Sequence, residues 1–222
     1  MAELPKDARE VYTTGDPPED GPRARKHQLT REVKRMIESV ALLDVHATDD
    51  GDLATLVDQA AALADRLEPL PSLKARGGLA LAGGDDAALL ERSGITGRSN
   101  PLAAPLQMWF DGDQVRGTAV YTDAYEGPPG CLHGGFVAAA FDDLMGFAQT
   151  FSGRAGYTGT FTIKYRKPTP LNKRLDYAAG VIKTDGRKIW CWGTCHDGDD
   201  LLAEAEILFI TPKFGIPIPK DT

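Results

Sequence analysis

The sequence predicts an α+β fold in which an antiparallel sheet wraps around one long helix, with a helical extension before it. From residue 105 onward, β-rich runs are separated by Asp-Gly pairs, which supply the positive φ angles that tight hairpin turns require. Between the second and third of these runs lies GPPGCLHGGFVAAAFDDLMG, residues 127–146, whose apolar residues surround a helix on nearly all sides. Such a helix favours enclosure by a sheet over lying on its surface.

Residues 105–213 therefore read as two strands, the helix and four further strands, followed by a tail at 214–222. The turns of the three hairpins are expected at DGD (111–113), TDGR (184–187) and HDGD (196–199). This order predicts a compact sheet domain in the C-terminal half of the chain.

The N-terminal half divides into three parts. Residues 1–27 are rich in Pro, Gly and mixed charges, which predicts a disordered or extended arm. Residues 28–69 hold two apolar patterns with three- and four-residue steps, the first with Thr30 as a candidate N-cap, and predict a helical hairpin. Residues 70–104 are rich in Gly, Ser, Asp and Pro and predict an irregular linker.

Composition argues against several classes of protein. The formal net charge of −7 over 222 residues is opposite to the basic footprint that nucleic-acid binding requires. No apolar run approaches the ~18 residues of a membrane-spanning helix, and the charged N-terminus differs from a secretion signal, so a cytoplasmic location is expected. Three cysteines, Cys131, Cys191 and Cys195, form no Cys-x-x-Cys pair, so we expect no disulfide framework and no metal site.

The glycine pair before the helix and the aspartate pair within it are the candidate chemical groups. Gly134 and Gly135 fall at the helix N-terminus, where free N–H groups and the positive end of the helix dipole favour a developing negative charge. Asp142 lies on a stripe of small residues that begins at Gly135, whereas Asp143 is rotated from it by about 100°. The spacing alone leaves open which aspartate acts. A carboxylate buried in an apolar helix would be costly, which favours a functional role.

The distance between these groups has a consequence for assembly. Eight residues at 1.5 Å rise separate Gly134 from Asp142 by about 12 Å along the helix axis. A donor and a carboxylate that act on one carbonyl must therefore come from two copies of the helix. The sequence thus predicts a site shared across a dimer interface.

The motif GPPG-x-x-HGG-x6-D, followed by K-Y-x-K-P-x-P-L and later by G-R-K, resembles the hotdog-fold acyl-CoA thioesterases. Within that family the resemblance is nearest to the phenylacetate-degradation branch. The resemblance covers residues 105–212. It implies a hotdog fold, assembly as homodimers or homotetramers, and hydrolysis of a fatty or aromatic acyl-CoA without a cofactor. It also favours Asp142 as general base or nucleophile and the Gly134 N–H as oxyanion donor.

Other residues match positions of the same family with less specific signals. His133 either orients the substrate or braces the loop before the helix, and Thr158 either positions the carboxylate or is an ordinary strand residue. Four basic residues match CoA-binding positions, although charged strand ends are usually only solvated. They are Lys164, Arg166, Arg187 and Lys188.

Two other functions compete with hydrolysis. A hotdog module that binds acyl-CoA without turnover would share the fold and the binding residues. Hydratase chemistry on this fold would need a D-x4-H arrangement, and no histidine follows Asp142 or Asp143 in the helix. Hydratase activity is therefore the weakest alternative.

Overall fold

The computed structural model describes residues 19–72 and 91–213. The helices of this part are α2 (Gly21–Ala41), α3 (Asp50–Leu67) and α5 (Gly134–Ala148), with 3-10 turns η2 (Asp123–Tyr125) and η3 (Gln149–Ser152) on either side of α5. The strands are β1 (Gln107–Asp111), β2 (Gln114–Val120), β3 (Tyr157–Tyr165), β4 (Arg174–Asp185), β5 (Lys188–Asp197) and β6 (Asp200–Ile210). The predicted α+β class and the order of two strands, a helix and four strands are confirmed.

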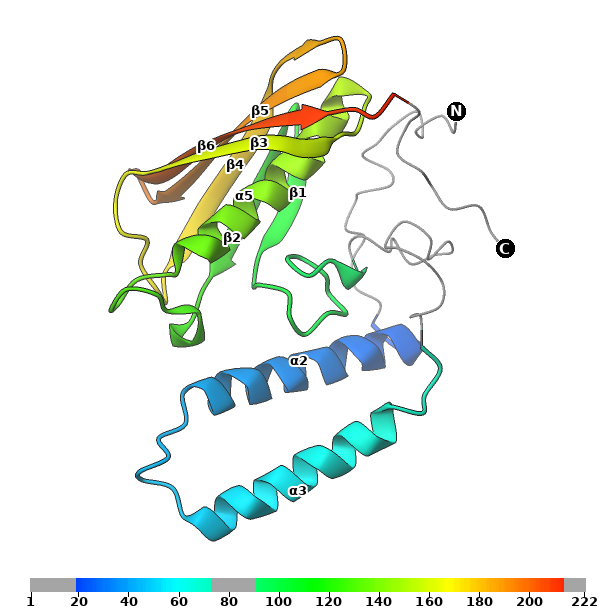
Figure 1. Cartoon of the computed structure of the whole chain (residues 1–222), viewed down its shortest axis with the longest axis vertical. Coiled ribbons are helices and arrows are strands. Elements are labelled where there is room, and N and C mark those ends of the chain that lie inside the picture. Colours follow the sequence, from blue (N-terminus) through cyan, green and yellow to red (C-terminus); the bar gives the residue numbers. More distant parts are fainter. Residues whose placement is uncertain (1–18, 73–90, 214–222) are drawn as a thin grey trace.

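All six strands form one antiparallel sheet in the order β1-β2-β4-β5-β6-β3. The chain crosses the sheet through α5, so that β3 becomes an edge strand paired only with β6 among the described strands (Figure 1). Gly112, Gly186 and Gly198 adopt φ angles of 62°, 53° and 59°, which confirms the three predicted Asp-Gly hairpin turns.

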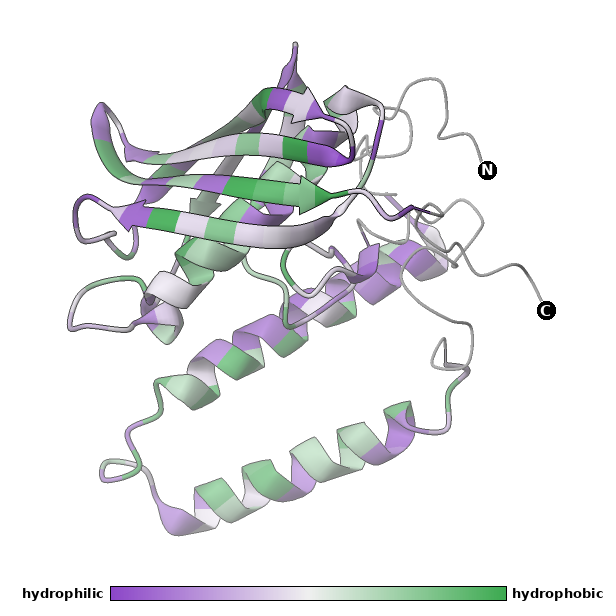
Figure 2. Ribbon diagram, turned by 45° about the horizontal axis from the view of Figure 1, so that its top comes forward, coloured by the Kyte–Doolittle hydropathy of each residue, from purple (hydrophilic) through white to green (hydrophobic). Residues whose placement is uncertain are grey.

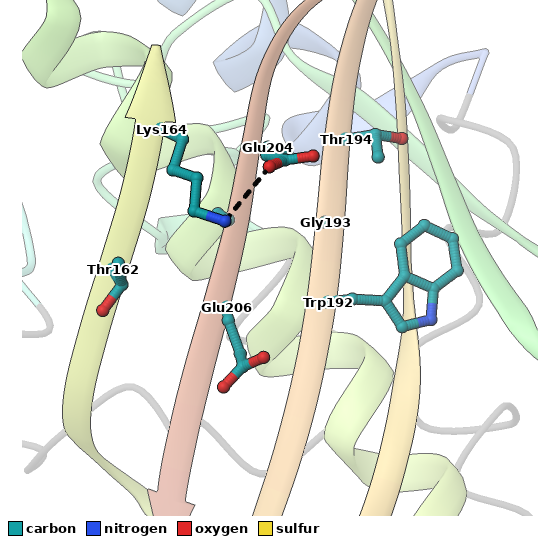
Figure 3. Close-up of a pocket in the computed structure, with 8 residues that line it drawn as sticks. Thr162, Lys164, Trp192, Gly193, Thr194, Glu204 and Glu206 are labelled. Atoms are coloured by element: carbon teal, nitrogen blue, oxygen red, sulfur yellow. Dashed lines mark ion pairs between the residues drawn. The ribbon is translucent and has the colours of Figure 1, made fainter. Parts of the chain in front are cut away.

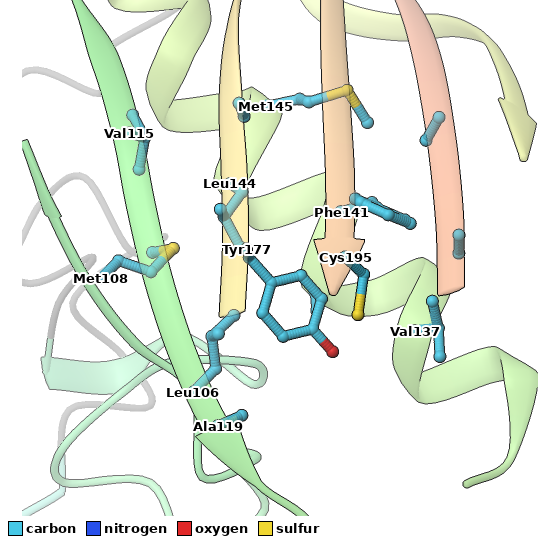
Figure 4. Packing of buried hydrophobic residues seen from close by; sticks show 14 of the residues in the cluster. Leu106, Met108, Val115, Ala119, Val137, Phe141, Leu144, Met145, Tyr177 and Cys195 are labelled. Atoms are coloured by element: carbon cyan, nitrogen blue, oxygen red, sulfur yellow. The ribbon is translucent and has the colours of Figure 1, made fainter. Parts of the chain in front are cut away.

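The core lies between α5 and the concave face of the sheet (Figure 4). Val137, Phe141, Leu144 and Met145 point from α5 into this core and are completely buried. Since the sheet covers only this side of the helix, the opposite side remains partly open, and His133, Gly135 and Asp142 are exposed. The predicted enclosure of α5 is therefore only half achieved within one chain.

The N-terminal helices form a hairpin that lies beside the sheet domain (Figure 1). Helix α2 begins at Gly21 with Pro22 in its first turn, so the predicted arm over 1–27 is wrong for its last residues; residues 1–18 lie outside the described part. Thr30 is not an N-cap. It is buried in the middle of α2, and its hydroxyl donates to the Lys26 carbonyl at 2.9 Å.

A buried carboxylate joins α2 to the segment before β1. Glu91 accepts hydrogen bonds from Arg23 at 3.1 Å and from the Ser99 hydroxyl, and contacts His27 Nε2 at 2.7 Å. Burial alone would raise the pKa of Glu91, but the hydrogen bonds from Ser99 and His27 and the nearby positive charges lower it overall. The described end of the predicted linker is therefore an irregular but packed segment that fixes α2 in place. No helix in residues 19–72 and 91–213 combines the length and apolarity needed to cross a bilayer.

The close approach of α5 to the sheet gives a stability prediction. A Cβ at Gly193 would lie 2.9 Å from the buried Phe141 ring, so Gly193→Ala should lower the free energy of unfolding by about 1–3 kcal/mol. The matched control is Gly146→Ala on the open side of α5, where a Cβ meets nothing within 4 Å and should not destabilise the helix. Urea unfolding of both variants measures this, and equal effects would contradict the packing described.

Candidate active site

The loop before α5 ends in a histidine cap. His133 occupies the N-cap position with extended backbone angles, and its Nδ1 accepts the Gly135 N–H at 3.0 Å. This hydrogen bond corresponds to the bracing role among the two left open for His133. It also occupies the Gly135 N–H, whereas the Gly134 N–H has no acceptor within residues 19–72 and 91–213.

Asp142 and Gly134 are held at opposite ends of the edge strand β3. The Thr158 hydroxyl, near the start of β3, donates to Asp142 Oδ1 at 3.0 Å. The Tyr165 hydroxyl, at the end of β3, donates to the Gly134 carbonyl at 2.9 Å. The strand and the open side of the helix therefore form one continuous surface with a carboxylate at one end and an amide donor at the other.

A β-bulge accounts for the orientation of Thr158. The register of β3 against β6 shifts between Thr158 and Thr160. In a regular strand, residues two apart share a face, so Thr158 would lie on the same outer face as Thr162 and Lys164. The extra residue turns Thr158 toward α5 instead, where it meets Asp142.

The second aspartate serves a different purpose. Asp143 Oδ2 accepts hydrogen bonds from Thr96 at 2.8 Å and from Ser93 at 3.1 Å, both in the segment before β1. Burial raises the pKa of Asp143, the two hydroxyls lower it, and the adjacent Asp142 raises it further, with a net rise. The structure thus places the two aspartates apart as predicted, with Asp142 exposed and Asp143 packed against the segment at 91–104.

The four predicted CoA-binding residues do not converge within one chain. Lys164 and Arg166 both form ion pairs with Glu204. Lys164 and Glu204 also line a pocket on the outer face of the sheet, opposite the face that packs against α5 (Figure 3). Arg187 and Lys188 lie at the β4–β5 turn, where Arg187 donates to the Thr211 carbonyl at 3.0 Å. Lys188 and Tyr157 both pair with Ile210, which puts this turn at the Asp142 end of the sheet.

Comparison with known proteins agrees with this architecture. A crystal structure of a thioesterase superfamily protein superposes with a TM-score of 0.74 and 27% identity, covering 87% of this chain and 97% of that one. Over 87 residues, 38% of the chain, the sequence is 36% identical to acyl-coenzyme A thioesterase THEM4 of Xenopus laevis and 34% identical to that of Mus musculus. The chain covers 39% and 37% of the lengths of these two relatives. No protein-family model matches it.

The fold is the hotdog fold of the thioesterase superfamily, as the motif predicted. The curated relatives are named acyl-CoA thioesterases, which confirms the resemblance on which the sequence interpretation depends.

The raised pKa of Asp143 predicts that the free energy of unfolding depends on pH. Because its pKa is raised in the fold, the protonated carboxyl stabilises the protein at pH below its unfolded pKa of about 3.9, and this contribution is lost as pH rises through the folded pKa. Asp143→Asn keeps an acceptor for Ser93 and Thr96 without the charge. Its stability relative to wild type should therefore increase as pH rises from 4 to 7 in urea unfolding.

The control for this experiment is Asp143→Leu, which leaves both hydroxyls without an acceptor. The free energy of unfolding of this variant should be about 1–3 kcal/mol lower than that of wild type at every pH. A difference between Asp143→Asn and wild type that does not change with pH would show that ionisation of Asp143 does not oppose folding.

Proposed function

We propose that the chain hydrolyses the thioester bond of a fatty or aromatic acyl-CoA, giving the free acid and CoA. The observation that carries this proposal is the placement of Asp142 and the Gly134 N–H at opposite ends of one edge strand. A thioesterase needs a donor for the developing oxyanion and a carboxylate that attacks the carbonyl or activates water. The chain offers both groups on a surface that a second copy would complete.

Pairing of two copies along β3 would assemble this site. If two β3 strands run antiparallel across a two-fold axis, the Thr158 end of one lies beside the Tyr165 end of the other. Asp142 of one copy then approaches Gly134 of its partner, which resolves the separation of about 12 Å within a single helix. The same contact would cover the open side of α5, so the assembly is proposed to be a homodimer or a dimer of dimers.

In this arrangement the substrate carbonyl oxygen accepts the Gly134 N–H, at the positive end of the α5 dipole. Thr158 holds Asp142 Oδ1, so Oδ2 remains available to the reaction. Asp142 either takes a proton from water that attacks the carbonyl carbon, or attacks that carbon itself to form an anhydride that water then opens. In both routes the C–S bond breaks, and CoA leaves as the thiolate and takes up a proton.

The phosphates of CoA are assigned to Arg187 and Lys188. Both lie at the Asp142 end of the sheet, on the turn next to the start of β3. Lys164 and Arg166 are paired with Glu204 on the outer face, which favours the alternative of solvated strand ends for these two residues. Substituting Arg187 should therefore raise KM for acyl-CoA more than substituting Arg166.

The first test of hydrolysis compares the two aspartates. Asp142→Asn should lower kcat by about 10²-fold or more, because the amide is a poor base and nucleophile. Asp143→Asn should retain kcat within a few-fold, since within residues 19–72 and 91–213 the Asp143 carboxylate accepts hydrogen bonds only from Ser93 and Thr96. Thiol release from a panel of aliphatic and aromatic acyl-CoAs measures both. Loss of turnover in Asp143→Asn alone would overturn the assignment, and wild-type binding without turnover would instead establish an acyl-CoA-binding module.

The second test asks whether the site is shared between copies. Gly134→Pro removes the N–H donor at the first helical position, where proline is tolerated and the extended His133 suits a following proline. Alone, this variant and Asp142→Asn should both be inactive. Co-expressed, they should recover about a quarter of wild-type activity, because half of the dimers hold one intact site of two. No recovery on mixing would place both groups of the site in one chain.

A further inference from the structure

The helical hairpin carries apolar side chains that nothing in the described chain covers. On α2, Met36, Ile37 and Val40 are exposed by 42%, 45% and 71%, and on α3 Leu56 and Val57 are exposed by 53% and 66%. Helix α3 buries no residue at all. Figure 2 shows apolar residues along both helices, on a part of the molecule outside the sheet domain. A patch of this extent marks an interaction surface in a folded protein.

The chain's own sheet domain is not the occupant of this surface. Helix α2 contacts the body of the protein through Ala24, His27 and Thr30, its only buried residues. At 100° per residue, this face lies roughly 130° around the helix from the centre of Met36, Ile37 and Val40. Because Glu91 fixes the first face against the segment before β1, the apolar stripe of α2 points away from the sheet domain.

The two helices of one hairpin also do not bury each other. They are joined by the short link at 42–49 and run antiparallel (Figure 1), yet Leu56 and Val57 of α3 stay more than half exposed. Each helix of the hairpin therefore has an exposed apolar stripe. A second helix pair could cover both stripes and form the core of a four-helix bundle.

The charges of the two helices indicate what the occupant is. Helix α2 holds six basic and two acidic residues, a net charge of +4, and α3 holds four acidic residues and one basic residue, a net charge of −3. In a bundle of two hairpins, each basic helix lies beside an acidic helix of the other copy. An anionic lipid surface would attract α2 but repel the aspartates of α3.

We propose that the hairpins of two copies of this chain pack together as an antiparallel four-helix bundle, with α2 of one copy against α3 of the other. This self-association surface is separate from the edge strand β3 and from Asp142 and Gly134. Its occupant is a second copy of the chain.

The first test removes the apolar contact. Leu56→Glu with Val57→Glu should raise the dissociation constant of the full chain's self-association at least tenfold in a sedimentation velocity dilution series. The matched control is Thr55→Glu with Ala62→Glu, which adds the same charge to the far side of α3 and should leave the constant unchanged. Because α3 buries no residue, neither variant should unfold the sheet domain, which circular dichroism checks.

The second test asks whether α2 shares the interface. Ile37→Glu with Val40→Glu, on the apolar stripe of α2, should self-associate at least tenfold more weakly than wild type. The matched control is Arg31→Gln with Arg35→Gln, which makes the same change in net charge on the far side of α2 and should leave the dissociation constant unchanged. Equal effects of the two pairs would overturn the bundle.

Two further outcomes would also overturn it. One is an unchanged dissociation constant in Leu56→Glu with Val57→Glu. The other is binding to phosphatidylserine vesicles that this variant abolishes while self-association persists. Thiol release measured on the same samples separates this result from the proposed hydrolysis, because neither pair of variants touches Asp142 or Gly134.

Discussion

The structure depends on the division of α5 into two sides. One side carries Val137, Phe141 and Leu144 into the core and holds the sheet together. The other side carries the Gly134 N–H and Asp142, the two groups that we propose act on the substrate. A single sheet of six strands covers one side of a helix and leaves the other open. Burial of the core and exposure of Asp142 are therefore two results of the same packing, and we propose that a second copy of the chain completes the open side.

The sequence predicted the parts of the fold that local patterns determine. Asp-Gly pairs placed the three hairpin turns, and alternating β-rich runs placed the strands, because both signals depend on neighbours within a few residues. Helix α2 was predicted too short, since its first turns are polar and gain stability from the distant Glu91. The partners of Asp143 were missed for the same reason. Ser93 and Thr96 lie about fifty residues away in a segment whose composition resembles a linker.

Within the candidate site, the sequence identified the chemical groups but not their supports. Helical geometry predicted that Asp142 and Asp143 face different sides, and the family resemblance, not the spacing, favoured Asp142 as the acting carboxylate. The β-bulge that turns Thr158 toward Asp142 could not be predicted, because its only sign in the sequence is a glycine between two threonines. Lys164 and Arg166 matched a family pattern, yet their pairing with Glu204 depends on strand register, which no local motif encodes.

The segment at 91–104 links the two surfaces at which a second copy is proposed to bind. Glu91 holds α2 through Arg23 and His27, while Ser93 and Thr96, a few residues later, hold α5 through Asp143. Buried hydrogen bonds to charged groups are costly to break, so this short segment fixes the hairpin relative to the helix that carries Asp142. A hairpin with so little apolar burial of its own would otherwise have no defined position. Adjacent aspartates thus differ in role: Asp142 faces the open side, where we propose that the substrate binds, and Asp143 holds the segment that positions α2.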